Sequence, residues 1–179
     1  MINKAFLTLA AALAFSSSAM ADESKGSLFS YQVGYSSNSI SSEGTTEPDA
    51  GGLYNGVDFF HVTPSGFGLG IGFDINYWSP DNSQGVSDGH VTYTMGATAK
   101  VGYTFENKFD IPLKLKAGVG YGLMDVTVHD GWGIQYEAAA EYRIYKAFGL
   151  GVKYKYAEAD MLGTTIKNDA TIYYMSLGY

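Results

Sequence analysis

Large apolar side chains alternate with small or polar ones along most of the chain. In the stretch FGLGIGFDINYWS, residues 67–79, the odd-numbered positions are apolar from Phe67 to Tyr77, and the even-numbered positions carry three glycines and then Asp74. A period of two residues indicates a β-strand whose two faces meet different environments. The same period predicts eight strands, at residues 27–36, 53–63, 67–79, 90–105, 113–123, 133–145, 148–157 and 171–179.

The faces of the predicted strand 53–63 are the hardest to assign, because Phe59 and Phe60 are adjacent. We assign Val57 and Phe59 to the apolar face, so that the carboxylate of Asp58 points to the other side.

The links between the predicted strands are alternately long and short. The long, polar links are 37–52, 79–89, 125–131 and 158–169, and the short ones are 64–66, 106–112 and the region of residue 146. An up-and-down meander has such links when its two rims face different compartments. We therefore predict an all-β fold, a closed eight-stranded antiparallel up-and-down barrel, which leaves no strand edge unpaired.

The residues of the polar face indicate whether the apolar face of the barrel points inward or outward to lipid. A soluble barrel would place the glycine rows 68/70/72 and 118/120/122 on a wet surface, where they contribute nothing. Inside a narrow eight-stranded barrel the same glycines leave room for long charged side chains. We therefore predict a transmembrane barrel with its apolar face outward and a polar lumen. The charged residues assigned to this lumen are Asp58, Asp74, Lys100, Lys114, Lys116, Glu137, Glu141, Arg143, Lys153 and Lys155.

The N-terminal segment has the features of a secretory signal peptide. Lys4 precedes an apolar run that is too short to span a bilayer, and Ala19 and Ala21 form an A-x-A cleavage site. We predict a signal peptide at residues 1–21 and a barrel domain at residues 22–179.

Composition excludes several classes of function. The chain has no cysteine, so it has no disulfide, thiolate metal site or cysteine nucleophile. Without Lys4 it carries 10 basic and 18 acidic residues, a formal charge of −8, which argues against nucleic acid as a partner. The glycine runs GLGIG and GVGYG lie within strands and lack the spacing of a phosphate-binding loop, so we predict no cofactor.

The signal peptide, the eight alternating strands and the terminal YYMSLGY together resemble the small outer-membrane β-barrels of Gram-negative bacteria, the OmpA, OmpX and opacity-protein type. The resemblance covers essentially the whole mature chain and rests on architecture. It implies short turns in the periplasm, long loops outside the cell, and a C-terminal signal recognised by the barrel assembly machinery. That signal falls on Tyr173, Met175, Leu177 and Tyr179, with tyrosine in the last place where the family usually has phenylalanine.

Two arrangements of the lumen charges are open. They form a narrow, porin-like path for ions or small solutes, or they pair with one another and plug the barrel. We favour the plug, because buried charges are tolerated when they are paired.

The predicted long links are strongly acidic, with Lys167 as their single lysine. Exposure of these links to water is enough to explain this composition. The more specific hypothesis is that divalent cations bridge these carboxylates to lipopolysaccharide. The spacing does not match an EF-hand, so we predict no defined metal site. The acidic residues are Glu43, Glu47, Asp49, Asp81, Asp88, Asp125, Asp130, Glu158, Asp160 and Asp169.

A lipid-A-modifying enzyme is a further alternative. It requires histidine, serine and a carboxylate at the outer rim, and His90 and His129 fall near that rim. The resemblance implies an H-x-S pairing for the deacylase type, and the sequence reads HVT and HDG at these positions, with His61 expected at the opposite rim. We therefore predict no catalytic residues.

The predicted function is that of a non-enzymatic, monomeric, integral outer-membrane barrel with a structural or adhesion-like surface role. Its expected partners are outer-membrane lipid, lipopolysaccharide and the assembly machinery. The loops contain no motif that identifies a surface ligand.

Overall fold

The computed structural model describes residues 27–42, 45–46, 50–78, 92–105, 109, 111–126, 129–145 and 147–178. Its long strands are β1 (Ser27–Ser42), β3 (Ala50–Val62), β4 (Phe67–Trp78), β5 (Thr92–Thr104), β6 (Leu113–Val126), β7 (His129–Tyr145), β8 (Phe148–Met161) and β9 (Thr164–Gly178). A short strand, β2 (Thr45–Thr46), pairs with the end of β1. The predicted cleavage site at Ala19 and Ala21, and the terminal Tyr179, lie outside the described residues.

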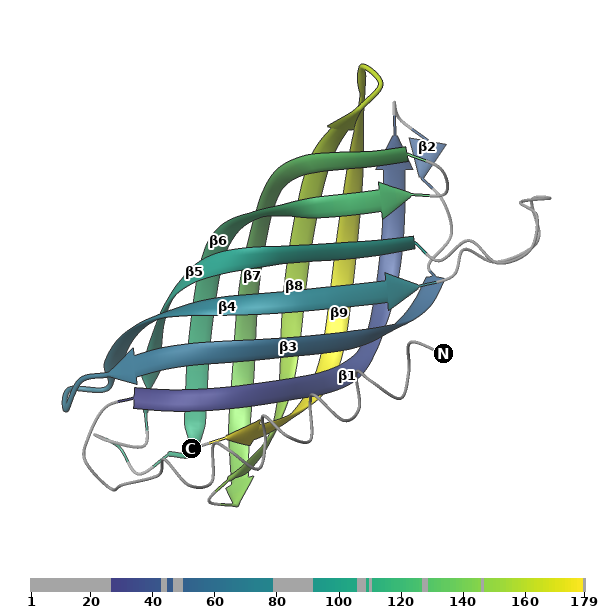
Figure 1. Ribbon diagram of the computed structural model, residues 1–179. Coiled ribbons are helices and arrows are strands. Elements are labelled where there is room, and N and C mark those ends of the chain that lie inside the picture. The colour runs from purple at the N-terminus through teal and green to yellow at the C-terminus, as the bar shows by residue number, and fades with distance from the viewer. Residues whose placement is uncertain are drawn as a thin grey trace.

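The eight long strands close into one antiparallel barrel. Each pairs with its neighbour in the chain, and β1 pairs with β9 from Ser30 opposite Gly178 to Ser42 opposite Ile166. In Figure 1 the strands of the near wall cross those of the far wall at a steep angle, as tilted barrel strands do. The predicted fold class is confirmed. The described part of the chain contains no helix long and apolar enough to cross a membrane.

The two faces of the strands differ as the alternation predicts. Leu69 and Ile71 on β4 are 57% and 52% exposed on the outside, whereas Asn76 on the same strand is fully buried inside. The assignment of strand 53–63 is also correct, since Asp58 is buried in the lumen and Phe59 is exposed. The barrel interior is therefore predominantly polar, with apolar side chains such as Phe60 and Met124 among the polar ones, and its outer wall is apolar, as in a barrel surrounded by lipid.

Three of the four predicted long links are mostly strand. β6 continues to Val126 and β7 begins at His129, while β8 and β9 are joined by a turn of only two residues, Leu162 and Gly163. β1 and β3 likewise extend into the predicted link 37–52. The prediction failed because the outward face of these segments is polar, as at Glu158 and Asp160, while apolar residues such as Met161 face inward. The apolar-outward alternation therefore ends, while backbone pairing continues regardless of side-chain type.

The turn between β8 and β9 places a leucine in an unfavourable conformation. Leu162 has φ = 52° and Gly163 has φ = 86°, the positive values of a tight hairpin turn that favours Asn-Gly. Leu162 is 84% exposed, so its side chain contributes little packing. We expect Leu162→Asn to raise the free energy of unfolding by up to about 1 kcal/mol, measured by urea unfolding in vesicles. Leu162→Ala, which keeps the unfavourable φ, is the matched control and should give no such gain. An equal gain in both variants would show that the effect is not conformational.

Candidate functional site: the lumen charge network

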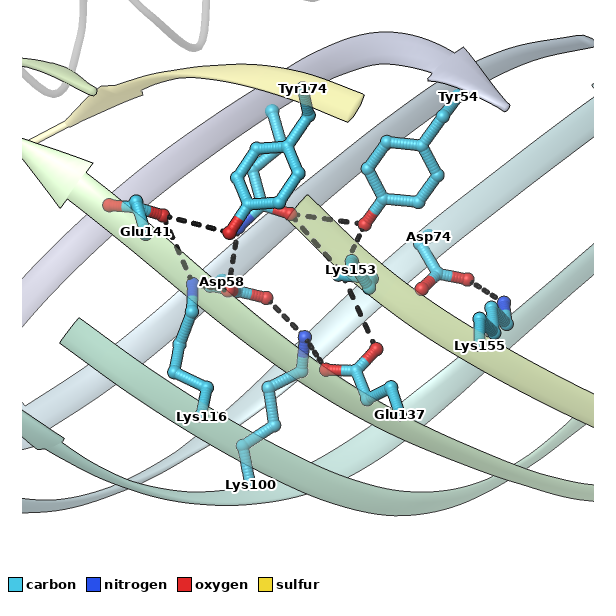
Figure 2. A network of polar contacts seen from close by, with 11 residues as sticks. Tyr54, Asp58, Asp74, Lys100, Lys116, Glu137, Glu141, Lys153, Lys155 and Tyr174 are labelled. Carbon is cyan, nitrogen blue, oxygen red and sulfur yellow. Dashed lines mark hydrogen bonds and ion pairs between the residues drawn. The ribbon is translucent and has the colours of Figure 1, made fainter. Parts of the chain in front are cut away.

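The barrel interior carries a dense set of buried charges. Nine of the ten charged residues predicted for the lumen are buried, and Arg143 is half-buried near the rim where β1 begins at Ser27 and β9 ends at Gly178. Side chains from β1, β3, β5, β6, β7, β8 and β9 point toward one another across the barrel, as Figure 2 shows. We call this set the lumen charge network. Its members are Gln32, Tyr54, Asp58, Lys100, Lys116, Glu137, Glu141, Lys153 and Tyr174.

Asp58 on β3 is the centre of the network. Its Oδ1 lies 2.5 Å from Nζ of Lys100, and its Oδ2 lies 2.7 Å from Nζ of Lys116. The Gln32 side chain also donates a hydrogen bond to Oδ2, at 2.8 Å. One carboxylate therefore receives donors from three other strands.

Two glutamates on β7 share the same lysines. Glu137 pairs with Lys100 at 2.5 Å and with Lys153 at 3.4 Å. Glu141 pairs with Lys116 at 3.3 Å and accepts a hydrogen bond from the Tyr174 hydroxyl at 3.2 Å. Each lysine of the network thus contacts at least one carboxylate, as burial requires.

Lys153 is completely buried and lies between two tyrosines. Its Nζ donates to the Tyr54 hydroxyl and, at 3.2 Å, to Oε1 of Gln32. The same ammonium lies 4.7 Å from the ring centroid of Tyr54 and 5.8 Å from that of Tyr174, within the range of cation–π attraction. The rings therefore supply negative potential in addition to the negative charge of Glu137, which pairs with Lys153.

A second, smaller polar group lies beside the network. Asp74 on β4 pairs with Lys155 on β8. Nearby, the Asn76 amide donates to Asn38 at 2.5 Å and Ser36 donates to Asn76 at 2.6 Å. These contacts link β1, β4 and β8.

Glycines on the lumen face provide the space that these side chains fill. A Cβ atom on Gly72, opposite Asp58 on the neighbouring strand, would lie 2.3 Å from Cε of Lys100 and 2.6 Å from Oδ1 of Asp58. A Cβ on Gly151 would lie 2.3 Å from the ring of Tyr174. In the glycine row on β4, Gly72 thus leaves room for Lys100, while Gly68 and Gly70 leave room for the ring of Phe60.

The network fills the middle of the barrel with charges that are paired with one another. The nine buried charges are four carboxylates and five lysines, a formal sum of +1. At the rim of Ser27 and Gly178, Lys114, Glu141 and Arg143 line a hollow of about 20 Å³. Such a space holds about one water molecule.

Three network members were missed by the sequence analysis: Gln32, Tyr54 and Tyr174. Only charged residues were assigned to the lumen from the sequence, so these uncharged members were not included. The alternation of the two strand faces identifies the tyrosines. Tyr54 lies four residues before Asp58 and therefore on the same inward face, and Tyr174 lies between the lipid-facing Tyr173 and Met175.

The other candidate groups lie elsewhere. Tyr173, Met175 and Leu177 form an outward-facing, exposed row on β9. His61 is exposed opposite Ser27, at the rim of Ser27 and Gly178, while His90 lies outside the described residues. The described residues contain no group of three or more side chains that could hold a metal ion.

The acidic residues of the predicted links fall into two groups. Asp125 and Asp130 lie opposite each other on β6 and β7, and Glu158 lies opposite Lys167 on β8 and β9. The acidic residues outside the described part are Glu43, Glu47, Asp49, Asp81 and Asp88.

Comparison with known proteins agrees with this architecture. Comparison with curated proteins finds no match. Among solved structures, the attachment invasion locus protein Ail of Yersinia pestis is 13% identical with a TM-score of 0.62, covering 87% of this chain and 99% of that one. Neisserial surface protein A is 12% identical with a TM-score of 0.59, covering 83% of this chain and 96% of that one. At these identities the likeness shows the fold alone. A family model for the outer membrane protein beta-barrel domain matches residues 7–179, and the chain therefore belongs to the outer membrane protein beta-barrel domain family.

Proposed function

We propose that this chain is a non-enzymatic outer-membrane barrel with a closed lumen and a surface-interaction role carried by its acidic outer hairpins. In this proposal it is exported by a signal peptide at residues 1–21. Its outward face contacts outer-membrane lipid and lipopolysaccharide, and the row Tyr173, Met175 and Leu177 serves the assembly machinery.

One observation carries the surface role. The outward face of β8 changes from aromatic to acidic between Tyr156 and Glu158, and the Tyr156 hydroxyl donates to Glu158. On β9 the same change falls at Asp169, which accepts from the Tyr154 hydroxyl. Tyrosines are typical of the boundary between hydrocarbon and water. The β8–β9 hairpin continues past this boundary to Leu162, and it rises farthest at the top of Figure 1.

The lumen supports a surface role over a porin-like one. Five lysines and four carboxylates are buried together, and the pair of Lys155 on β8 with Asp74 on β4, the opposite strand, crosses the path that a solute would take. The fold of Ail, which is named for attachment and invasion, supports the idea that such a closed barrel serves as a scaffold for surface hairpins.

The charge of the hairpins indicates the chemistry of the partner. On the outward face of β8 and β9, Glu158, Asp160 and Asp169 stand against the single Lys167. Such a surface attracts basic groups, and the attraction weakens as salt screens it. We therefore infer a basic protein surface as the partner.

Binding to a polycation tests this proposal. The purified barrel in nanodiscs is passed over immobilised poly-L-lysine, and binding is measured against salt concentration. We expect the triple variant Glu158→Gln, Asp160→Asn, Asp169→Asn to bind about tenfold more weakly, since each exposed pair contributes up to about 0.5 kcal/mol.

The matched control is Lys167→Gln, which removes a positive charge from the same hairpin and should strengthen binding. Equal binding by the wild type and the triple variant would refute a role for the hairpin carboxylates.

A further inference from the structure

Asn55 places an amide on the lipid-facing surface of the barrel. It points outward from β3, where its neighbours along the strand are Leu53, which is 65% exposed, and Val57. Across the neighbouring strands it lies opposite Val33 on β1 and Ile75 on β4. Apolar side chains therefore surround it on all four sides, within the hydrocarbon band. Among the described strands it is the one outward-facing residue with a side-chain amide.

The oxygen of this amide accepts a hydrogen bond. The Tyr31 hydroxyl on β1 donates to Oδ1 of Asn55 at 2.9 Å. The Nδ2 group has no hydrogen-bond acceptor among the residues that the structure describes. Acyl chains offer none either, and an unsatisfied polar group in hydrocarbon is costly.

We propose that the β1–β3 face is a self-association surface, and that its partner is a second copy of this chain. A two-fold axis along the membrane normal would bring the two Asn55 side chains together. Each Nδ2 would then donate to the other Oδ1, which has a second lone pair beside the one that Tyr31 uses. The result is a dimer in place of the monomer expected from the sequence.

The surroundings of Asn55 favour a second copy over other occupants. A partner must present apolar surface around an amide at the same depth in the bilayer, and an identical copy does so by symmetry. The sugars of lipopolysaccharide lie at the membrane surface, whereas the residues opposite Asn55 on both adjacent strands, Val33 and Ile75, are apolar. Hydrogen bonds between polar side chains are an established means of association for membrane segments.

The test is energy transfer between labelled barrels in phospholipid vesicles. The chain has no cysteine, so Ser65→Cys in the exposed turn after β3 gives a single labelling site. We expect the wild type to show transfer above the level of random mixing. Asn55→Leu should raise the dissociation constant roughly eightfold, the product of two hydrogen bonds at the average strength measured in membranes.

Two controls make the result specific. Val119→Leu, on β6 at the opposite wall, should leave the transfer unchanged. Tyr31→Phe should preserve it or increase it, because Asn55 then has two unsatisfied groups. Loss of transfer in Tyr31→Phe as large as that in Asn55→Leu would overturn the amide pairing.

Folding stability separates association from a purely structural role. Asn55→Leu removes a polar group from lipid and should therefore stabilise the isolated barrel while weakening the dimer. Loss of barrel stability with unchanged transfer would assign Asn55 to cross-strand support alone. Absence of transfer in the wild type would also refute the dimer.

Discussion

Asp58→Asn is expected to lower the free energy of unfolding by about 3–5 kcal/mol, the usual cost of removing one partner from a buried ion pair. The substitution keeps the size of the side chain, so the cost comes from charge and not from a cavity. Lys100 and Lys116 would lose the carboxylate that lies 2.5 and 2.7 Å from them. The formal charge of the nine buried groups would rise from +1 to +2. Urea unfolding in phospholipid vesicles measures the change.

The matched control for Asp58→Asn is Asp130→Asn, which removes a carboxylate from an exposed position at the end of β7. Its effect should stay within about 0.5 kcal/mol. A planar-bilayer recording adds a second readout, because the wild type should show no steady conductance on the nanosiemens scale. Equal stability of the wild type and Asp58→Asn would show that the network does not hold the barrel together.

The architecture was predictable because lipid and lumen impose opposite demands on adjacent residues. On β4, each outward residue from Phe67 to Tyr77 had to be apolar, and each inward one had to be small or polar. That constraint appears directly as alternation in the sequence. The alternation ends where the outward face of the strands meets water, and for this reason the outer parts of β6 and β8 were predicted as loops.

The lumen residues were predictable as a set, but their pairing was not. The alternation of faces places Asp58, Lys100 and Glu137 inside the barrel, but it does not give the position of each one along the barrel axis. That position depends on strand register, which the hairpins and the β1–β9 closure fix. Register also explains the role of Tyr54 and Tyr174, whose rings become neighbours of Lys153 once the barrel has closed.

Gly151→Val should destabilise the barrel by about 1–3 kcal/mol, the typical cost of overpacking. Gly151 lies directly opposite Tyr174, whose ring covers it, and a Cβ there would lie 2.3 Å from Cζ. The ring must therefore move. This movement breaks the hydrogen bond from its hydroxyl to Glu141 and removes the cation–π contact of the ring with Lys153. Unfolding in urea gives the stability, and tyrosine circular dichroism reports the displaced ring.

The cause of this loss can be isolated with two further variants. Leu150→Val changes the adjacent residue, which faces lipid, and should cost less than about 1 kcal/mol. Tyr174→Ala removes the ring that a valine at position 151 would strike. If the clash is the cause, the double variant Gly151→Val, Tyr174→Ala loses less stability than the sum of the two single variants, because contacting residues are coupled. Additive losses would mean that Gly151 is needed for its backbone rather than for the space it leaves to Tyr174.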